Sequence, residues 1–181
     1  MSTTTLKRMT VGYLIREGVQ GPEVFMGRKI ATPSSLKLRI AGKIIGYGGK
    51  RDVTDPSDVA CIVRECETET AVPGKSGIII EPDDAVPMAR FVVKNEDGRS
   101  DLILTYFVIK KWTGEANDSK EIVGARFYPI NDLPEDVLAL DTIVLPAIIA
   151  GQKLGGWAKY DAEMSKLVAS DVYPVETLEH E

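Results

Sequence analysis

The stretch Gly46–Val72, GYGGKRDVTDPSDVACIVRECETETAV, is the most informative part of the chain. It runs from a glycine-rich turn into a predicted helix over residues 56–71, which carries Arg64, Glu65 and Glu69. Glu65 and Glu69 are four residues apart and therefore project from one face of the helix, one turn apart. Two carboxylates beside a turn with exposed carbonyls form an oxygen-rich site that suits Mg²⁺ or Mn²⁺. The stretch thus indicates metal-assisted chemistry on a phosphate compound.

Local signals predict where this helix begins and which side is buried. Asp55 is expected to be the N-cap, Pro56 suits the first helical position, and Asp58 lies in the first turn, where the helix dipole favours a negative charge. Helical spacing predicts an inward stripe of Val59, Ile62, Val63, Cys66 and Thr70. A second set, on a different face, comprises Asp58, Cys61, Glu65, Thr68 and Glu69. We therefore expect the helix to separate packing from chemistry.

The rest of the chain contains more predicted strand than helix. Strands are expected over residues 6–15, 24–30, 38–47, 77–81, 89–94, 102–111, 123–130 and 155–161, with a loop over 31–37. A second helix is expected over about 141–150. Residues 165–181 read as a late strand or a frayed tail. This order predicts the α/β class, with a mixed sheet between helices in an α/β/α sandwich, as one domain over 1–164 and a C-terminal extension over 165–181.

Composition excludes several classes of protein. A chain of 181 residues with 44% hydrophobic and 27% charged residues fits one globular domain. The net charge of −5, without a basic run, argues against a protein that binds nucleic-acid backbone. The apolar runs are too short for a membrane span, and the N-terminus lacks a secretory signal. The two cysteines, Cys61 and Cys66, have no distant partner and fit a reduced, cytoplasmic setting.

Two common kinds of active site do not fit the sequence. The sole histidine, His180, is the penultimate residue, so a nucleophile activated by histidine has no plausible base. The turn Gly46-Tyr47-Gly48-Gly49-Lys50 matches neither GxGxxG nor GxxxxGK[ST]. The chain is therefore not expected to use a serine triad, a dinucleotide fold or a P-loop.

The glycine turn and the acidic helix together resemble the box of the Nudix hydrolases, G-x5-E-x7-R-E-U-x-E-E-x-G-U, in which U is aliphatic. Gly49 is followed by five residues and then by Asp55. Arg64-Glu65 matches the arginine and first glutamate of the box, and Glu69 matches its last glutamate. The closing aliphatic position is Val72.

The box also departs from the family pattern. Asp55 replaces the first glutamate, and eight residues rather than seven separate it from Arg64. Thr68 replaces one of the paired glutamates, Ala71 replaces the glycine, and Cys66 fills an aliphatic position. The missing carboxylate at Thr68 is expected to weaken the binding of further metal ions rather than abolish activity.

The resemblance extends over roughly residues 5–160, towards the MutT-type diphosphatases that act on oxidised purine nucleotides. It rests on VFMGRK at 24–29, FYPINDLP at 127–134 and DTIVLPAIIAGQKLGGW at 141–157. It implies a Nudix-like fold and a Mg²⁺-dependent reaction, with Mn²⁺ as a possible replacement, in which water cleaves a nucleoside triphosphate into a nucleotide and pyrophosphate.

The resemblance also assigns site residues. Glu65 and Glu69 would be metal ligands, one of them also helping to deprotonate the attacking water. Arg64 would pair with a carboxylate of the box and fix its orientation. The carbonyl of Gly48 would be a further ligand, and Glu121, from a later loop, would complete the shell.

The substrate-binding positions of the family match this sequence less closely than the box does. The purine-specific relatives use an asparagine before the glycine turn and an acidic pair before the C-terminal helix. This chain has Ile45 at the first place and Leu140-Asp141 at the second, so only Asp141 remains. Asp141 is equally well interpreted as a helix N-cap. Lys29 is a candidate contact for a phosphate or the base edge, and Lys50 completes the predicted substrate-binding set.

Three functions remain open from the sequence. The first is hydrolysis of a nucleoside triphosphate, with an oxidised purine nucleotide as one option. The second is hydrolysis of another nucleoside diphosphate derivative, such as a nucleotide sugar or a dinucleotide. The third is a catalytically weak domain that binds a nucleotide or a protein partner, which Thr68 and the insertion after Asp55 keep open. The expected partner is a small nucleotide, and the oligomeric state stays open.

Overall fold

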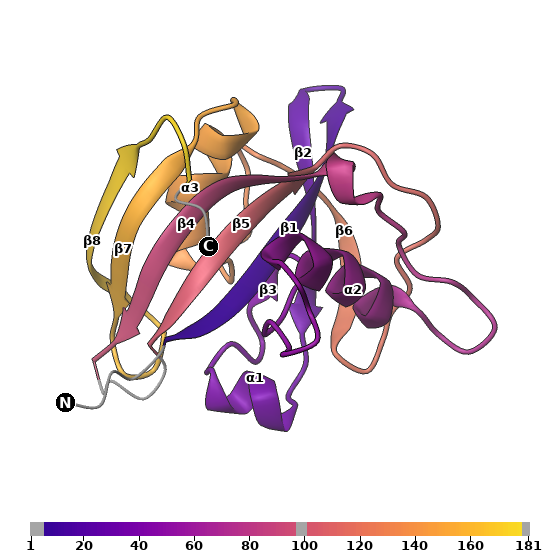
Figure 1. The fold of residues 1–181 in the computed structure, drawn as a ribbon, viewed down its shortest axis with the longest axis horizontal. Coiled ribbons are helices and arrows are strands. Elements are labelled where there is room, and N and C mark those ends of the chain that lie inside the picture. The colour runs from indigo at the N-terminus through magenta and orange to yellow at the C-terminus, as the bar shows by residue number, and fades with distance from the viewer. Residues whose placement is uncertain (1–5, 97–100, 179–181) are drawn as a thin grey trace.

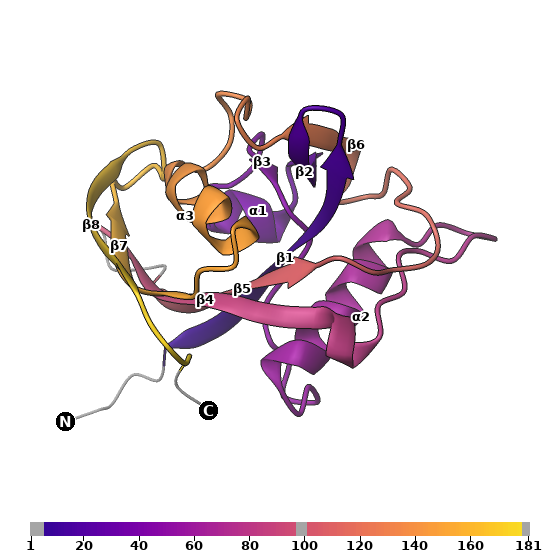
Figure 2. The same ribbon diagram turned by 90° about the horizontal axis from the view of Figure 1, so that it is seen from above.

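A mixed β-sheet lies between two layers of helix in the computed structural model, which describes residues 6–96 and 101–178. Helix α2 (Asp58–Thr70) covers one face of the sheet, while α3 (Ala139–Ile149) and the short α1 (Pro33–Lys37) lie on the other (Figures 1 and 2). The predicted α/β/α sandwich is therefore confirmed. The predicted tail residue His180 lies outside the described residues.

The sheet of the described residues has eight strands in the order β3-β2-β1-β5-β4-β7-β8, with β6 paired to β2. Strands β1 and β5 are parallel, as are β4 and β7, whereas the other pairs are antiparallel. The sheet is therefore mixed, as predicted. The strands are β1 (Lys7–Gly18), β2 (Gly21–Lys29), β3 (Ile44–Ile45), β4 (Ala85–Asn95), β5 (Leu102–Ile109), β6 (Ile122–Pro129), β7 (Leu154–Tyr160) and β8 (Leu167–Pro174).

Three predicted segments are wrong. Residues 31–37, expected as a loop, contain α1, which begins with Pro33 and is capped by the hydroxyl of Thr32. Of the strand expected over 38–47, only Ile44–Ile45 pairs with β2. The strand expected over 77–81 is replaced by one isolated bridge between Ile79 and Thr113, followed by a short 3₁₀ turn at 82–84. Short segments without strong periodicity take their structure from tertiary contacts, which explains these differences.

The C-terminal segment forms a strand, one of the two structures expected for it. Strand β8 pairs antiparallel with β7, with Trp157 opposite Asp171. Most of β8 is exposed to solvent. It therefore extends the sheet at the edge farthest from β2 (Figure 1).

The N-cap of α2 is Ser57, so the prediction of Asp55 is wrong. The hydroxyl of Ser57 accepts a hydrogen bond from the amide of Ala60 at 3.1 Å, and the helix begins at Asp58. The carboxylate of Asp55 instead binds the guanidinium of Arg64. A charged partner with two donors outcompetes a helix amide for this carboxylate.

The two faces of α2 are not separated as expected. Ile62, Cys66 and Thr70 of the predicted stripe are buried, but Val59 and Val63 are only partly so. Asp58, Cys61 and Glu69, expected on the chemical face, are buried as well. The helix therefore carries its polar groups into the molecule.

Both cysteines are free and buried. No helix of the described residues is long and apolar enough to cross a bilayer.

Hydrophobic side chains fill both spaces between sheet and helices. One cluster lies under α3 and includes Phe91, Val144 and Ile148. The other lies under α2 and includes Ile62 and Phe107. These two clusters fix α2 and α3 on opposite faces of the sheet.

Candidate functional site

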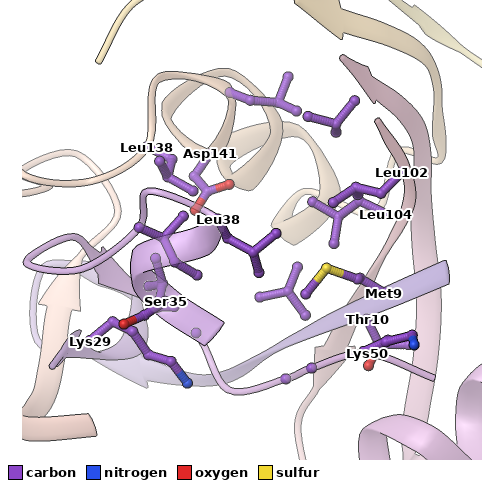
Figure 3. A pocket seen from close by; sticks show the side chains of 18 of the residues that line it. Met9, Thr10, Lys29, Ser35, Leu38, Lys50, Leu102, Leu104, Leu138 and Asp141 are labelled. Carbon is purple, nitrogen blue, oxygen red and sulfur yellow. The ribbon is translucent and has the colours of Figure 1, made fainter. Parts of the chain in front are cut away.

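A cavity of about 320 Å³ lies between the sheet, α1 and α3 and reaches the glycine turn before α2 (Figure 3). Its walls are largely apolar. Figure 3 places Asp141 on one side of the cavity and Lys29 and Lys50 on the opposite side. All the predicted site residues except Arg64 line this cavity. The apolar lining consists of Met9, Val11, Leu38, Ile40, Ile45, Val93, Leu102, Leu104, Leu138, Leu140 and Met164.

The glycine turn is fixed against strand β1. The amide of Thr10 donates to the carbonyl of Gly49 at 2.9 Å, and the amide of Gly12 donates to the carbonyl of Tyr47 at 2.6 Å. A side chain on Gly48 would place its Cβ 2.1 Å from the Thr10 carbonyl oxygen, so the approach requires glycine. The turn therefore presents a rigid backbone to the end of α2.

Glu69, near the C-terminal end of α2, contacts this turn. Its Oε2 accepts a hydrogen bond from the amide of Gly48 at 2.8 Å. Gly48, expected to act through its carbonyl, thus contacts the site through its N–H. Burial raises the pKa of Glu69 to about 7, although the neighbouring Lys29 and the Gly48 amide act to lower it.

Lys29, at the end of strand β2, bridges two of the predicted metal ligands. Its Nζ donates to Glu69 Oε1 at 2.5 Å and to Glu121 Oε2 at 2.7 Å. Lys29 is only 5% exposed. Burial lowers the pKa of Lys29, but the two carboxylates outweigh it and hold the pKa above its usual value. The lysine predicted to contact substrate is therefore the shared cation of two carboxylates, the buried Glu69 and the half-exposed Glu121.

Arg64 links two other carboxylates of the box. Its Nε and Nη2 donate to the two oxygens of Asp55 at 2.9 and 2.7 Å, and its Nη1 donates to Glu65 Oε1 at 2.7 Å. The guanidinium lowers the pKa of Asp55 to about 2. Arg64 thus pairs with carboxylates of the box, as the resemblance implied. The hydroxyl of Thr68 donates to the Arg64 carbonyl at 2.7 Å, and it is therefore engaged within the helix.

The residues present suit a divalent cation. Within residues 6–96 and 101–178, no three histidine, cysteine or acidic side chains converge closely enough to hold a metal ion. Glu69 and Glu121 nevertheless converge on one cation, the ammonium of Lys29. Glu65 lines the same cavity, with its carboxyl group packed against Gly49. Carboxylate oxygens are the ligands that Mg²⁺ and Mn²⁺ prefer, so the donor chemistry fits.

Asp141 occupies the opposite side of the cavity and has neutral partners. The hydroxyls of Tyr13 and Tyr106 donate to its two oxygens at 2.6 and 2.7 Å. Burial raises the pKa of Asp141 to about 6, although the two hydroxyl groups act to lower it. The interpretation of Asp141 as an N-cap is wrong, because Leu138 occupies that position and no side chain caps the helix.

The sequence analysis missed the two tyrosines. Tyr13 and Tyr106 lie on the adjacent parallel strands β1 and β5, with their rings 6.1 Å apart and 12° from parallel. A buried carboxylate requires hydrogen-bond donors. The sequence signal for such donors is a tyrosine on a strand that borders the cavity, and Tyr13 and Tyr106 both lie on such strands.

A cluster of arginines around Asp58 was also missed. Asp58 accepts hydrogen bonds from Arg8 at 3.2 Å, Arg51 at 3.2 Å, Arg90 at 3.4 Å and Thr105 at 2.9 Å. These partners come from β1, β4, β5 and the segment before α2. The cluster therefore fixes the N-terminal end of the helix that carries Glu65 and Glu69.

Comparisons with known proteins identify the fold. No family model and no curated protein matches the chain. Solved structures match with low sequence identity. The mutator MutT protein of Bacillus halodurans is 18% identical with a TM-score of 0.71, and the match covers 92% of this chain and 97% of that one. A MutT NUDIX hydrolase of Burkholderia pseudomallei is 18% identical with a TM-score of 0.62, over 78% of this chain and 97% of that one.

A third match has a ligand. It is the NUDIX domain of Shewanella oneidensis NrtR in complex with ADP ribose, which is 15% identical with a TM-score of 0.58, over 78% of this chain and 84% of that one. The similarity of all three covers most of the chain. The chain therefore has the fold of the MutT and Nudix hydrolases.

Proposed function

We propose that this protein is a Mg²⁺-dependent hydrolase of a nucleoside triphosphate, releasing a nucleotide and pyrophosphate. The observation that carries this proposal is the convergence of Glu69 and Glu121 on one cation, beside Glu65, at the edge of a largely apolar cavity. Such a cavity accommodates a nucleobase, while the acidic end accommodates a metal-bound phosphate chain.

The acidic residues have different roles in the proposed reaction. Glu65, Glu69 and Glu121 would hold the divalent cation, which supplies positive charge against the phosphate oxygens. One carboxylate of Glu65 or Glu69 takes the proton from the attacking water. Arg64 keeps Glu65 in a fixed orientation through its ion pairs. Water adds to one phosphorus and the bridging P–O bond between the α- and β-phosphates breaks, which separates the nucleotide from pyrophosphate. The turn at Gly48 holds Glu69 in place during this step.

The rest of the cavity would bind the nucleoside. Asp141 is a hydrogen-bond acceptor in a largely apolar wall that also contains the hydroxyls of Tyr13 and Tyr106, whereas the side chain of Ile45 has no polar atom. A site with few polar groups discriminates weakly between bases. An oxidised purine nucleotide is therefore one candidate substrate among several. Lys29 and Lys50 supply positive charge near the phosphates.

A second candidate is a nucleoside diphosphate derivative. The NUDIX domain of NrtR, which shares the fold, is in complex with ADP ribose. An apolar cavity with weak base selection is compatible with such a compound, whose second group extends from the diphosphate. The same metal ligands would serve both reactions.

A substrate panel with detection of pyrophosphate and orthophosphate tests the proposal. It includes normal and oxidised nucleoside triphosphates, nucleotide sugars, dinucleotides and ADP ribose, each with Mg²⁺ or Mn²⁺. We expect release of pyrophosphate from at least one triphosphate. Glu65→Gln should remove most of this activity with an unchanged melting temperature, because it removes a metal-binding charge.

Glu67→Gln is the matched control, since Glu67 lies on the same helix but outside the cavity lining. Equal activity of Glu65→Gln and the wild type would contradict the metal-site assignment. If no compound is hydrolysed but a nucleotide raises the melting temperature, the protein is a nucleotide-binding domain instead.

A further inference from the structure

Lys29 holds the position that a divalent cation would need. Its Nζ lies within 2.7 Å of an oxygen of both Glu69 and Glu121, and the side chain of Lys29 is 6% exposed. The ammonium thus forms ion pairs with two carboxylates, one of them almost fully buried. Without a cation, these two groups would repel each other, and the buried Glu69 would bear a large desolvation cost.

A lysine and a divalent cation cannot both occupy this position. The two carboxylates that Lys29 bridges are candidate metal ligands under the proposed function, on which this inference rests. Taking up a metal ion therefore requires breaking the ion pairs from Lys29 to Glu69 and Glu121. The displaced ammonium then needs another anion, because a buried lysine without one is costly.

A phosphate group supplies that anion. Lys29 lines the cavity, and its flexible four-carbon chain allows the ammonium to turn away from the carboxylates into the open space. We propose that Lys29 acts as a placeholder cation, which blocks metal binding until a phosphate-bearing substrate draws it away. Metal and substrate then bind with positive coupling, and each raises the affinity for the other by the same factor.

The first test measures Mn²⁺ binding without substrate, by electron paramagnetic resonance of free Mn²⁺. Lys29→Met removes the ammonium but keeps a side chain of similar length. We expect the dissociation constant for Mn²⁺ to fall by at least about tenfold, within the usual range of coupling between sites. Binding as weak as in the wild type, or absent from both proteins, overturns the proposal.

Lys50→Met is the matched control. Lys50 lines the same cavity, and in the part of the chain that the structure describes no ion pair joins it to Glu69 or Glu121. It removes the same charge without opening the carboxylate pair. We expect its Mn²⁺ affinity to change by less than about threefold, since a solvated charge at a distance is screened. If both variants changed the Mn²⁺ dissociation constant equally, Lys29 would act only through its charge and not through its position, and the proposal would be overturned.

A measurement on the wild type decides the matter if Lys29→Met does not fold. Acetylation by acetic anhydride, followed by mass spectrometry, reports how accessible each lysine is. We expect saturating Mn²⁺ to raise the labelling rate of Lys29 severalfold and to leave that of the exposed Lys110 unchanged. An unchanged rate at Lys29 under saturation overturns the proposal.

These outcomes are independent of the proposed hydrolysis. A protein that hydrolyses a triphosphate, yet shows equal Mn²⁺ affinity with and without Lys29, keeps its function and loses this inference. A protein that hydrolyses nothing, but binds Mn²⁺ more tightly after Lys29→Met, keeps the inference and loses the function.

Discussion

Glu69 and Asp141 are two buried carboxylates that line the same cavity, but their partners differ in charge. Glu69 binds the ammonium of Lys29 and the amide of Gly48. Asp141 binds two neutral hydroxyl groups, from Tyr13 and Tyr106. Burial raises the pKa of both groups, to about 7 and about 6 respectively.

The two carboxylates differ in whether a metal ion can replace their hydrogen-bond partners. An ammonium ion and a divalent cation meet the same electrostatic need, so Lys29 beside Glu69 is replaceable by a metal ion. The tyrosines beside Asp141 are fixed by their rings in the core and supply only hydrogen bonds. We therefore expect chemistry at Glu69 and recognition at Asp141.

The largest expected effect separates these two roles. Glu69→Gln should lower kcat for the best substrate of the panel by about 10²- to 10⁴-fold, the range for loss of a group that assists proton transfer. Asp141→Asn should change kcat by less than about tenfold and act mainly on KM, because it lies at the substrate-binding side. Steady-state kinetics on both variants measures this.

One outcome would contradict this assignment of roles. If Asp141→Asn lowered kcat as much as Glu69→Gln, both carboxylates would take part in the chemical step. Circular dichroism and melting curves of both variants serve as the control for folding.

A smaller effect concerns stability and pH. The pKa of Asp141 rises from 3.8 to about 6 on folding. Between these values the folded state binds more protons than the unfolded state, so this group makes the protein less stable as pH rises. The loss amounts to about 2 kcal/mol between pH 4 and pH 7, at about 1.4 kcal/mol per pKa unit.

Asp141→Asn removes this dependence. Urea unfolding at pH 4, 5, 6 and 7 should show the free energy of unfolding of Asp141→Asn gaining on the wild type as pH rises. Because Glu69 titrates in both proteins, the difference between them isolates Asp141. A difference that is constant with pH would contradict the burial of an ionisable Asp141.

The smallest effect compares two tyrosines. Tyr13 and Tyr47 are both buried, but the hydroxyl of Tyr47 has no hydrogen-bond partner among the described residues. Tyr47→Phe should raise the free energy of unfolding by about 1 kcal/mol, because it removes an unsatisfied polar group. Tyr13→Phe should lower it by about 1–3 kcal/mol, because Asp141 loses a donor. Urea unfolding at pH 7 measures both, and equal signs would contradict these assignments.

The local pattern was sufficient to predict the periodic α2 and the long strands, but not the N-cap of α2 or which of its side chains are buried. The three glutamates that reach the cavity were also predicted. The resemblance of the box to the Nudix pattern also led to the correct fold. Local spacing carries this information because a helix fixes the relative positions of residues three and four apart.

Partners from distant segments could not be predicted. Lys29 was predicted to contact substrate, whereas its contacts are with Glu69 and Glu121, which are 40 and 92 residues away. The tyrosines of Asp141 come from strands 128 and 35 residues away. Such pairs depend on strand order in the sheet, which a single sequence does not specify.

The glycine turn has a consequence for how this protein tolerates substitution. A Cβ on Gly46 would lie 2.4 Å from the Gly12 carbonyl oxygen, one on Gly48 would meet the Thr10 carbonyl, and one on Gly49 would lie 2.6 Å from the Glu65 carboxyl group. Backbone neighbours thus exclude side chains at Gly46 and Gly48, whereas a side chain at Gly49 would displace the Glu65 carboxyl group. A random library over this turn should retain glycine at the first two positions and lose activity when Gly49 changes. Variation that changes substrate preference should accumulate in the apolar walls of the cavity instead.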